Sequence, residues 1–184
     1  IDIFWHTYDK EYDPIFETID KTKFPIVKSR VDPDEPIDSY LENDFKTDEY
    51  FTYEPQWTRD HRFGWFKFWN SIKQVNSMRI DYEKENNVPQ NQIDDLSNIS
   101  NEIMYSPGYA RFGGYYSSFF IGSPEHMNHV ARVYDEFITN KLVPRGHKIE
   151  AERIFARWIS HFKMYDGLDV RFHRIRFDGD VIDH

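Results

Sequence analysis

The sequence predicts an α/β fold, and two kinds of segment support that prediction. Short apolar runs at residues 1–6, 24–31 and 115–121 have the length of buried strands. Residues 63–85 and 124–140 instead repeat apolar side chains at helical spacing. With 184 residues, the chain has a length that suits a single domain with a sizeable core.

The first strand is predicted over residues 1–6 and the second over residues 24–31. Ligands in open α/β sheets bind just past the C-terminal ends of strands, so His6 and Asp9 are candidate ligand contacts. The same two residues could equally be polar groups that close a loop. Residues 32–36 (DPDEP) follow the second strand, and their two prolines predict a rigid acidic turn.

The most strongly predicted helix covers Phe63–Glu85. Just before it, Arg59 and Arg62 carry guanidinium groups, which suit a phosphate. They could also be ordinary surface arginines that pair with Asp60. The apolar side chains expected on one side of this helix are Trp65, Phe68, Ile72, Val75 and Tyr82.

A loop and a buried strand are predicted in succession after residue 107. The loop covers residues 108–114 and carries Arg111 and the pair Gly113 and Gly114. The strand covers residues 115–121. This combination is typical of an edge that faces a ligand, but it also fits an ordinary structural connection.

Two further helices are predicted in the second half of the chain. Ser123 caps the first, which begins at Pro124 and ends near residue 140. The second covers residues 149–162 and opens with Glu150 and Glu152, as the helix dipole favours. Short strands are predicted at 102–105 and 170–177, and the second is followed by Asp178 and Asp180.

Composition bounds the class of function. The formal net charge is −9, which does not favour a nucleic-acid-binding surface. No stretch approaches the roughly 18 apolar residues of a membrane span, and no signal peptide is visible. The chain has no cysteine, which excludes thiol chemistry and a disulfide scaffold and is compatible with a reducing compartment. We expect a cytoplasmic protein.

Aromatic residues make up 18% of the chain. A heavily aromatic core explains such a content, but sugar-binding sites also use aromatic platforms and carboxylates, so a glycan ligand is permitted. The motifs of dinucleotide enzymes, P-loop enzymes, zincins and typical serine hydrolases do not occur.

Several stretches stand in an order that points to a known family. They are 2–9 (DIFWHTYD), 82–87 (YEKENN), 93–107 (IDDLSNISNEIMYSP), Gly113-Gly114, 119–123 (FFIGS) and the late helix with Glu150. In this order the chain resembles a family of bacterial and viral glycosyltransferase-like proteins that build capsular or surface polysaccharides. The resemblance covers most of the chain. It implies a GT-A-like nucleotide-diphospho-sugar transferase fold, with a mainly parallel central sheet flanked by helices.

The chain departs from the family pattern in three places. The family has a strand before residues 2–9, whereas this chain begins there without a Met, so we expect further residues upstream. The family also has a central strand with a terminal acid, but here Val88 runs directly into Pro89, so we expect a segment missing from this sequence. Residues 115–118 stand where the family often has an acid, so the acceptor site would use hydroxyls and aromatic faces, or be lost.

The resemblance implies a sugar transfer from a nucleoside diphosphate-sugar to a hydroxyl of a glycan acceptor. His6, Thr7 and Asp9 would lie by the nucleotide, and Arg59 and Arg62 would be further contacts of the sugar-nucleotide. The residues implied at the sugar or acceptor are Arg111, Gly113, Gly114 and Tyr115.

The implied chemistry needs charge at two points. The departing diphosphate needs a divalent cation, Mg²⁺ or Mn²⁺, or basic groups, and Asp178 and Asp180 are the candidate metal ligands. An inverting transfer also needs a carboxylate base, for which Glu150 or Glu152 could serve. Each pair also has an interpretation without function. Asp178 and Asp180 could simply form a terminal turn, and Glu150 and Glu152 could stand at a helix start only because the helix dipole favours acidic residues there.

Two other classes of function compete with the transferase. One is a non-catalytic glycan-binding or degenerate transferase module, which missing central acids would favour. The other is a metal-dependent phosphoesterase, suggested by 8 His and many Asp, although the ligand spacing of such an enzyme does not occur.

Overall fold

The computed structural model describes residues 3–8, 26–44, 59–88, 102–106, 109–110, 114–115, 120–139, 151–166, 173–175 and 181–183. These residues belong to two compact units. Unit 1 takes residues 1–92 and 127–149, and unit 2 takes residues 93–126 and 150–184.

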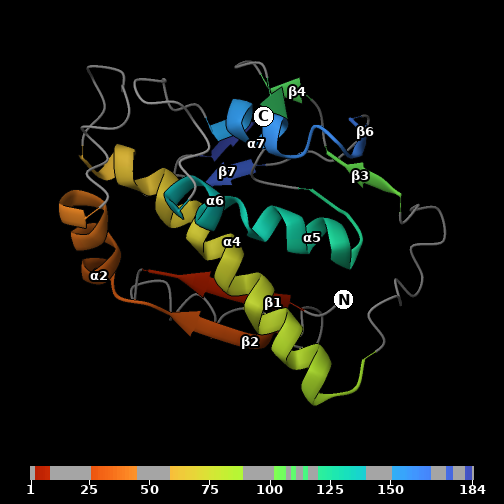
Figure 1. The fold of residues 1–184 in the computed structure, drawn as a ribbon, viewed down its shortest axis with the longest axis horizontal. Helices are drawn as coiled ribbons and strands as arrows, with labels where there is room; N and C mark the ends of the chain where they lie inside the picture. The colour runs from red at the N-terminus through yellow and green to blue at the C-terminus, as the bar shows by residue number, and fades with distance from the viewer. Residues whose placement is uncertain are drawn as a thin grey trace. The chain divides into compact units, whose positions relative to one another are not determined.

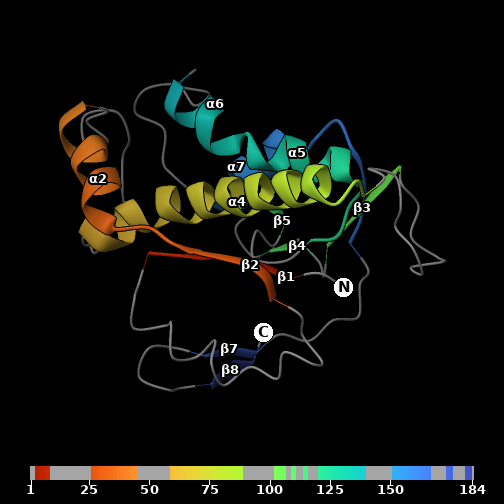
Figure 2. The same ribbon diagram turned by 90° about the horizontal axis from the view of Figure 1, so that it is seen from below.

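Unit 1 is built on a parallel pair of strands, β1 (Ile3–Thr7) and β2 (Ile26–Val31). Both confirm the predicted strands. Thr7 lies opposite Val31 in the register, so the two strands end at the same edge. Helix α4 (Arg59–Glu85) lies along one face of this pair (Figures 1 and 2).

Helix α4 confirms the predicted helix, starts earlier than expected, and ends in a Schellman motif. Asn87 has a left-handed backbone with φ 52°. Its amide donates to the carbonyl of Lys84 at 3.4 Å, and the amide of Val88 donates to the carbonyl of Glu83 at 2.9 Å. Asparagine tolerates the left-handed region better than most residues, which explains why the helix ends there.

The buried side of α4 differs from the predicted side. Phe63, Phe66 and Trp69 are buried, and the last two have no exposed surface. Helix α4 packs against β1 and also against α6 (Val133–Thr139), so its apolar contacts spread around more than one side. The residues predicted on the buried side are instead half-buried. They are Trp65, Phe68, Ile72, Val75 and Tyr82.

The predicted acidic turn at residues 32–36 is wrong for its second half, because helix α2 (Asp34–Ser39) begins there. Pro33 stands at the cap position and Pro36 lies in the first turn, where a missing amide is tolerated. A π-helix, η2 (Tyr40–Asp44), follows directly. The buried apolar residues of these two helices are Ile37 and Leu41.

The helix predicted over residues 124–140 is two helices, α5 (Pro124–Ala131) and α6. They are separated at Arg132, whose amide donates to the carbonyl of His129 at 3.1 Å. This bond spans three residues, as in a 3₁₀-helix, and tightens the backbone there.

Unit 2 contains short strands in pairs. Its parallel pair is β3 (Ile103–Tyr105) with β6 (Lys163–Tyr165). Its antiparallel pairs are β4 (Tyr109–Ala110) with β5 (Gly114–Tyr115), and β7 (His173–Ile175) with β8 (Val181–Asp183). Helix α7 (Ala151–Trp158) packs against β5.

Two predictions for unit 2 are wrong. The expected loop at 108–114 contains β4, because the chain reverses and pairs Tyr109 with Tyr115. The expected strand at 115–121 is not continuous, because Phe120 lies in no strand. Its ring instead packs on Phe155 at 5.2 Å, in the core of the unit. The strands at 102–105 and 170–177 and the helix at 149–162 are confirmed by the shorter β3, β7 and α7.

The start of α5 confirms the predicted cap. Ser123 Oγ accepts a hydrogen bond from the amide of His126 at 3.4 Å, and the amide of Ser123 donates to His126 Nδ1 at 3.0 Å. This is a capping box with an imidazole in place of the usual carboxylate. A Cβ at Gly122 would lie 2.7 Å from the Cβ of His126, so only glycine fits before this cap.

The α/β class is therefore confirmed for the described residues. Both parallel and antiparallel pairs occur, each in a two-stranded sheet. Strands β6 and β8 were not predicted, because three residues give too short a pattern to detect. A GT-A-like arrangement with a mainly parallel central sheet remains a proposal.

Candidate functional site

Side-chain alternation decides which residues of β1 and β2 meet α4. Residues two apart point to the same face of a strand. Phe4, His6 and Tyr8 all contact α4, and so do Lys28 and Arg30. Phe4 lies opposite Lys28 in the register, and His6 lies opposite Arg30. The aromatic contact of β1 thus comes at its start, and the polar contacts of β1, made by His6 and Tyr8, come at the carboxyl edge.

Helix α4 presents a polar stripe to this edge. Lys67, Asn70, Ser71 and Gln74 follow the i, i+3, i+4, i+7 spacing that places residues on one helix face. Tyr82 lies further along the helix, and its ring contacts the start of β1 at 5.7 Å. The helix therefore runs antiparallel to the strands, with its N-terminal half beside their carboxyl ends.

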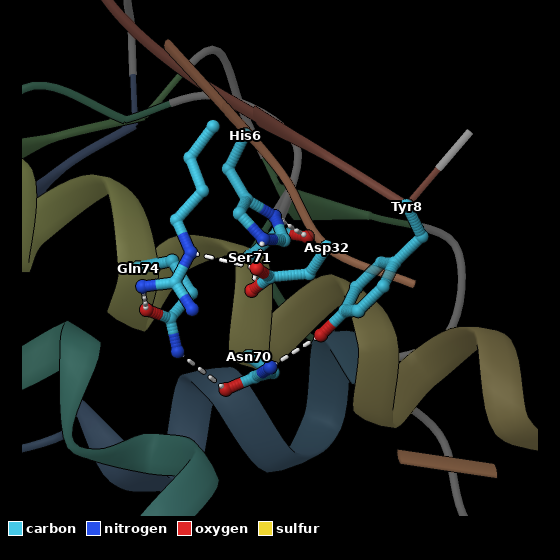
Figure 3. Close-up of polar contacts among 7 residues, drawn as sticks. His6, Tyr8, Asp32, Asn70, Ser71 and Gln74 are labelled. Carbon is cyan, nitrogen blue, oxygen red and sulfur yellow. Dashed lines mark hydrogen bonds and ion pairs between the residues drawn. The ribbon is translucent and has the colours of Figure 1, made fainter. Parts of the chain in front are cut away.

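His6 lies at the centre of the polar contacts. Its side chain has no exposed surface. Nδ1 lies 2.9 Å from Ser71 Oγ, and Nε2 lies 3.1 Å from Asp32 Oδ2 (Figure 3). Burial lowers the pKa of His6, although the carboxylate of Asp32 acts in the opposite direction. The neutral imidazole is therefore favoured near neutral pH.

Asp32 follows β2 directly and joins His6 to Arg30. Its Oδ1 accepts a hydrogen bond from Arg30 Nε at 2.7 Å, and Arg30 Nη1 donates to Gln74 Oε1 at 3.0 Å. Burial raises the pKa of Asp32, but the hydrogen bonds from Arg30 and His6 outweigh burial, so this pKa lies below its ordinary value. The amide of Asp32 also donates to the carbonyl of Thr7 at 3.0 Å, which ties the two strand ends together.

The contacts continue from Gln74 to Tyr8 (Figure 3). Gln74 Nε2 donates to Asn70 Oδ1 at 3.3 Å, and Asn70 Nδ2 donates to the hydroxyl of Tyr8. The Tyr8 ring meets His6 edge-on at 4.9 Å, and burial raises the pKa of Tyr8 to about 12. We call the connected residues the edge cluster: His6, Tyr8, Arg30, Asp32, Asn70, Ser71 and Gln74.

Lys67 borders the edge cluster. Its Nζ pairs with Asp34 at 2.8 Å and with Asp38 at 3.0 Å, and it lies 5.9 Å from the centroid of the Tyr8 ring. Burial lowers the pKa of Lys67, but its two carboxylate partners outweigh burial and hold this pKa above its ordinary value. A fixed cation therefore stands between α2 and the aromatic side of the cluster.

Ser71, His6 and Asp32 stand in the order of a nucleophile, a base and an orienting acid. The surroundings do not suit that use. The His6 side chain is fully enclosed, and Ser71 is half-buried in the middle of α4. These three residues instead suit a positioning role, because Ser71 and His6 fix the carboxylate of Asp32 at the end of β2.

Some of the predicted site residues fall within the described residues. His6 and Thr7 lie in β1 and meet Asp32. Arg59 and Arg62 lie at the start of α4, on the N-terminal side of Asn70 and the rest of the polar stripe. In unit 2, Gly114 and Tyr115 form β5 and Glu152 lies in α7. The predicted site residues outside the described part are Asp9, Arg111, Gly113, Glu150, Asp178 and Asp180.

Sequence reasoning missed the members of the edge cluster on α4 and the role of Arg30. A signal for the α4 members was present, because Asn70, Ser71 and Gln74 are polar residues at helical spacing. Arg30 gave no such signal, because its contact with Gln74 depends on how α4 packs against β2.

The described residues do not fit a divalent metal ion as they stand. No group of three or more His, Asp or Glu side chains among them could hold such an ion. Both carboxylate oxygens of Asp32 are hydrogen-bonded, and Asp34 and Asp38 pair with Lys67.

Comparison with known proteins gives no match, whether to a protein-family model, a curated protein or a solved structure. Within the part of the chain that the structure describes, no helix has both the length and the apolar character needed to cross a membrane.

Proposed function

We propose that the protein transfers a sugar from a nucleoside diphosphate-sugar to a hydroxyl of a glycan acceptor, on a GT-A-like fold. The parallel pair β1 and β2 carries this proposal, because it brings Thr7, His6 and Asp32 to one carboxyl edge. Such edges are where ligands bind in open α/β sheets. The half-buried Tyr8 adds an aromatic side chain to the polar groups there.

In the proposed reaction, the acceptor oxygen forms a bond to the anomeric carbon of the donor sugar. The bond from that carbon to the diphosphate breaks, and the diphosphate leaves with the bonding electron pair. For an inverting transfer, the acceptor proton passes to a carboxylate, and we propose Glu152 of α7, or Glu150 just before it in the sequence, for this role. Mg²⁺ or Mn²⁺ held by Asp178 and Asp180 would stabilise the leaving group in this proposal.

The test is nucleoside diphosphate release, measured by mass spectrometry over a panel of sugar nucleotides with Mn²⁺ and mixed glycan acceptors. We expect release from one donor that depends on the acceptor. Replacing Glu150 and Glu152 together by glutamine is expected to abolish it. Glu125→Gln is the matched control, because Glu125 lies in the first turn of α5, as Glu152 does in α7, and is exposed. No release from any donor would contradict the proposal.

One observation favours a second candidate, a non-catalytic module that binds nucleotide sugars or glycans. Both ring nitrogens of His6 and both carboxylate oxygens of Asp32 already form hydrogen bonds within the protein. Neither is therefore free to act as a base at this edge. This candidate predicts that a sugar nucleotide raises the melting temperature, as any ligand of the native state does, without release of its diphosphate.

A further inference from the structure

Arg30 differs from the rest of the edge cluster in its exposure. Its side chain is 51% exposed, whereas Asp32 is 21% exposed and His6 is enclosed. The other four members of the cluster are half-buried. Arg30 is therefore the member of the cluster that a ligand meets most readily.

Two of the three guanidinium nitrogens of Arg30 are held by neighbouring side chains, and the third is open. Nε donates to Asp32 and Nη1 donates to Gln74. Nη2 forms no hydrogen bond with the residues that the structure describes. Of the five N–H donors of a guanidinium, two are thus used to set its orientation, and the outer donors remain for an oxyanion.

The two supports of Arg30 are themselves supported. Asp32 is held by His6, and His6 is held by Ser71. Gln74 is held by Asn70, which donates to Tyr8. In this arrangement the enclosed imidazole of His6 orients the carboxylate of Asp32, and that carboxylate orients the guanidinium of Arg30. A side chain that is oriented before binding loses less conformational entropy when the ligand arrives.

We propose that Arg30 is an anion-binding residue that takes the diphosphate of a nucleotide ligand, positioned for it by the rest of the edge cluster. The inference rests on the proposed function for the nucleotide part of the ligand. Phosphate oxygens match the guanidinium donors, and Arg30 directly precedes Val31, the last residue of β2 at the carboxyl edge.

The charges nearby predict which form of the diphosphate binds. With His6 neutral, Arg30 and Lys67 carry two positive charges against the three negative charges of Asp32, Asp34 and Asp38. A bare diphosphate meets a slightly unfavourable balance there. A diphosphate that carries Mg²⁺ brings less negative charge, so we expect the magnesium complex to bind more tightly.

The test is calorimetric titration of the whole protein with sodium pyrophosphate, with and without MgCl₂, and with UDP and GDP. We expect magnesium pyrophosphate and one nucleoside diphosphate to bind. Arg30→Gln is expected to weaken both by about tenfold or more, and Arg30→Lys by less, because lysine keeps the charge without the fork. Lys28→Gln is the matched control for lost charge, since Lys28 lies on the same face of β2 and should change the affinity by less than about twofold.

Gln74→Glu separates anion binding from a structural role. The change places a second carboxylate beside Nη1 of Arg30, which strengthens that contact and adds a negative charge next to the guanidinium, but it also removes the Nε2 donor of the 3.3 Å bond to Asn70. These two effects on stability oppose each other, so we expect a melting temperature close to that of the wild type together with an affinity for pyrophosphate that falls by about tenfold. This variant keeps the test valid even if Arg30→Gln does not fold.

Failure of this inference differs from failure of the proposed function. No binding of pyrophosphate, UDP or GDP by the wild type, or equal losses in Arg30→Gln and Lys28→Gln, would overturn the role of Arg30. Sugar transfer with an unchanged nucleotide affinity in Arg30→Gln would overturn it as well, and would leave the transferase standing. Binding that depends on Arg30 without any sugar transfer would support the inference and contradict the transferase.

Discussion

Replacing Ser71 by alanine removes the hydroxyl that partners Nδ1 of the enclosed His6 ring at 2.9 Å. A buried polar group left without its partner costs about 1–3 kcal/mol of stability. Alanine favours a helix over serine by about 0.5 kcal/mol, which offsets part of that cost. We therefore expect a net loss of about 0.5–2.5 kcal/mol in the free energy of unfolding. For a chain of this length, the melting temperature should fall by about 1–10 °C.

The measurement is urea unfolding followed by tryptophan fluorescence, in a double-mutant cycle with His6→Leu. Once the imidazole is gone, Ser71→Ala should no longer cost stability, and the helix propensity of alanine should give a small gain. The coupling free energy between the two positions should be about 1 kcal/mol or more.

A second serine on the same helix provides the matched control. Ser77 is exposed on α4, so Ser77→Ala makes the same chemical change without a buried partner and should stabilise by no more than about 0.5 kcal/mol. Equal effects of Ser71→Ala in the wild-type and His6→Leu backgrounds would refute the reasoning, because the hydroxyl would then be independent of the imidazole.

Three further predictions concern packing and pH. Trp69→Ala should cost about 3–5 kcal/mol, read from the shift in the urea midpoint, because Trp69 is fully buried. Gly122→Ala should destabilise the protein by about 1–3 kcal/mol, since its Cβ would meet His126. Gly64→Ala has open space around its Cβ and should stabilise α4 by about 0.5–1 kcal/mol. In thermal melts, the melting temperature should therefore fall for the first variant and rise for the second. Burial holds the pKa of both His6 and His126 below the 6.5 expected in the unfolded chain. The unfolded state therefore takes up protons first, so stability is full above about pH 6.5 and declines as the pH falls below it. The melting temperature should drop between pH 7.5 and 5.5, and less in His6→Asn; a rise on acidification would contradict the sign.

Periodicity and strand length located much of the fold, because these signals are local. The run at 24–31 and the helix from Phe63 were both found, since each needs only its own residues. The break at Arg132 was not found, because no proline or glycine marks it and the interruption is a single tightened turn.

The candidate site was predicted less completely than the fold. That His6 lies at a carboxyl edge follows from its place at the end of an apolar run. The contact between His6 and Ser71, which are 65 residues apart in the chain, depends on the position of α4 along the direction of the strands. A shift of one helical turn would bring other side chains to the imidazole, and no local pattern fixes that shift. The network that holds Arg30 was beyond sequence reasoning for the same reason.

The cap of α5 selects one tautomer of His126. Because the amide of Ser123 donates to Nδ1, the lone pair of the ring must lie on Nδ1 and its hydrogen on Nε2. A neutral imidazole in water exchanges between both forms, whereas here the start of a helix holds one. The ring also stands edge-on to Phe162 at 4.5 Å, which restricts its rotation. The nitrogen chemical shifts of this single ring therefore provide a spectroscopic probe of whether the first turn of α5 is formed.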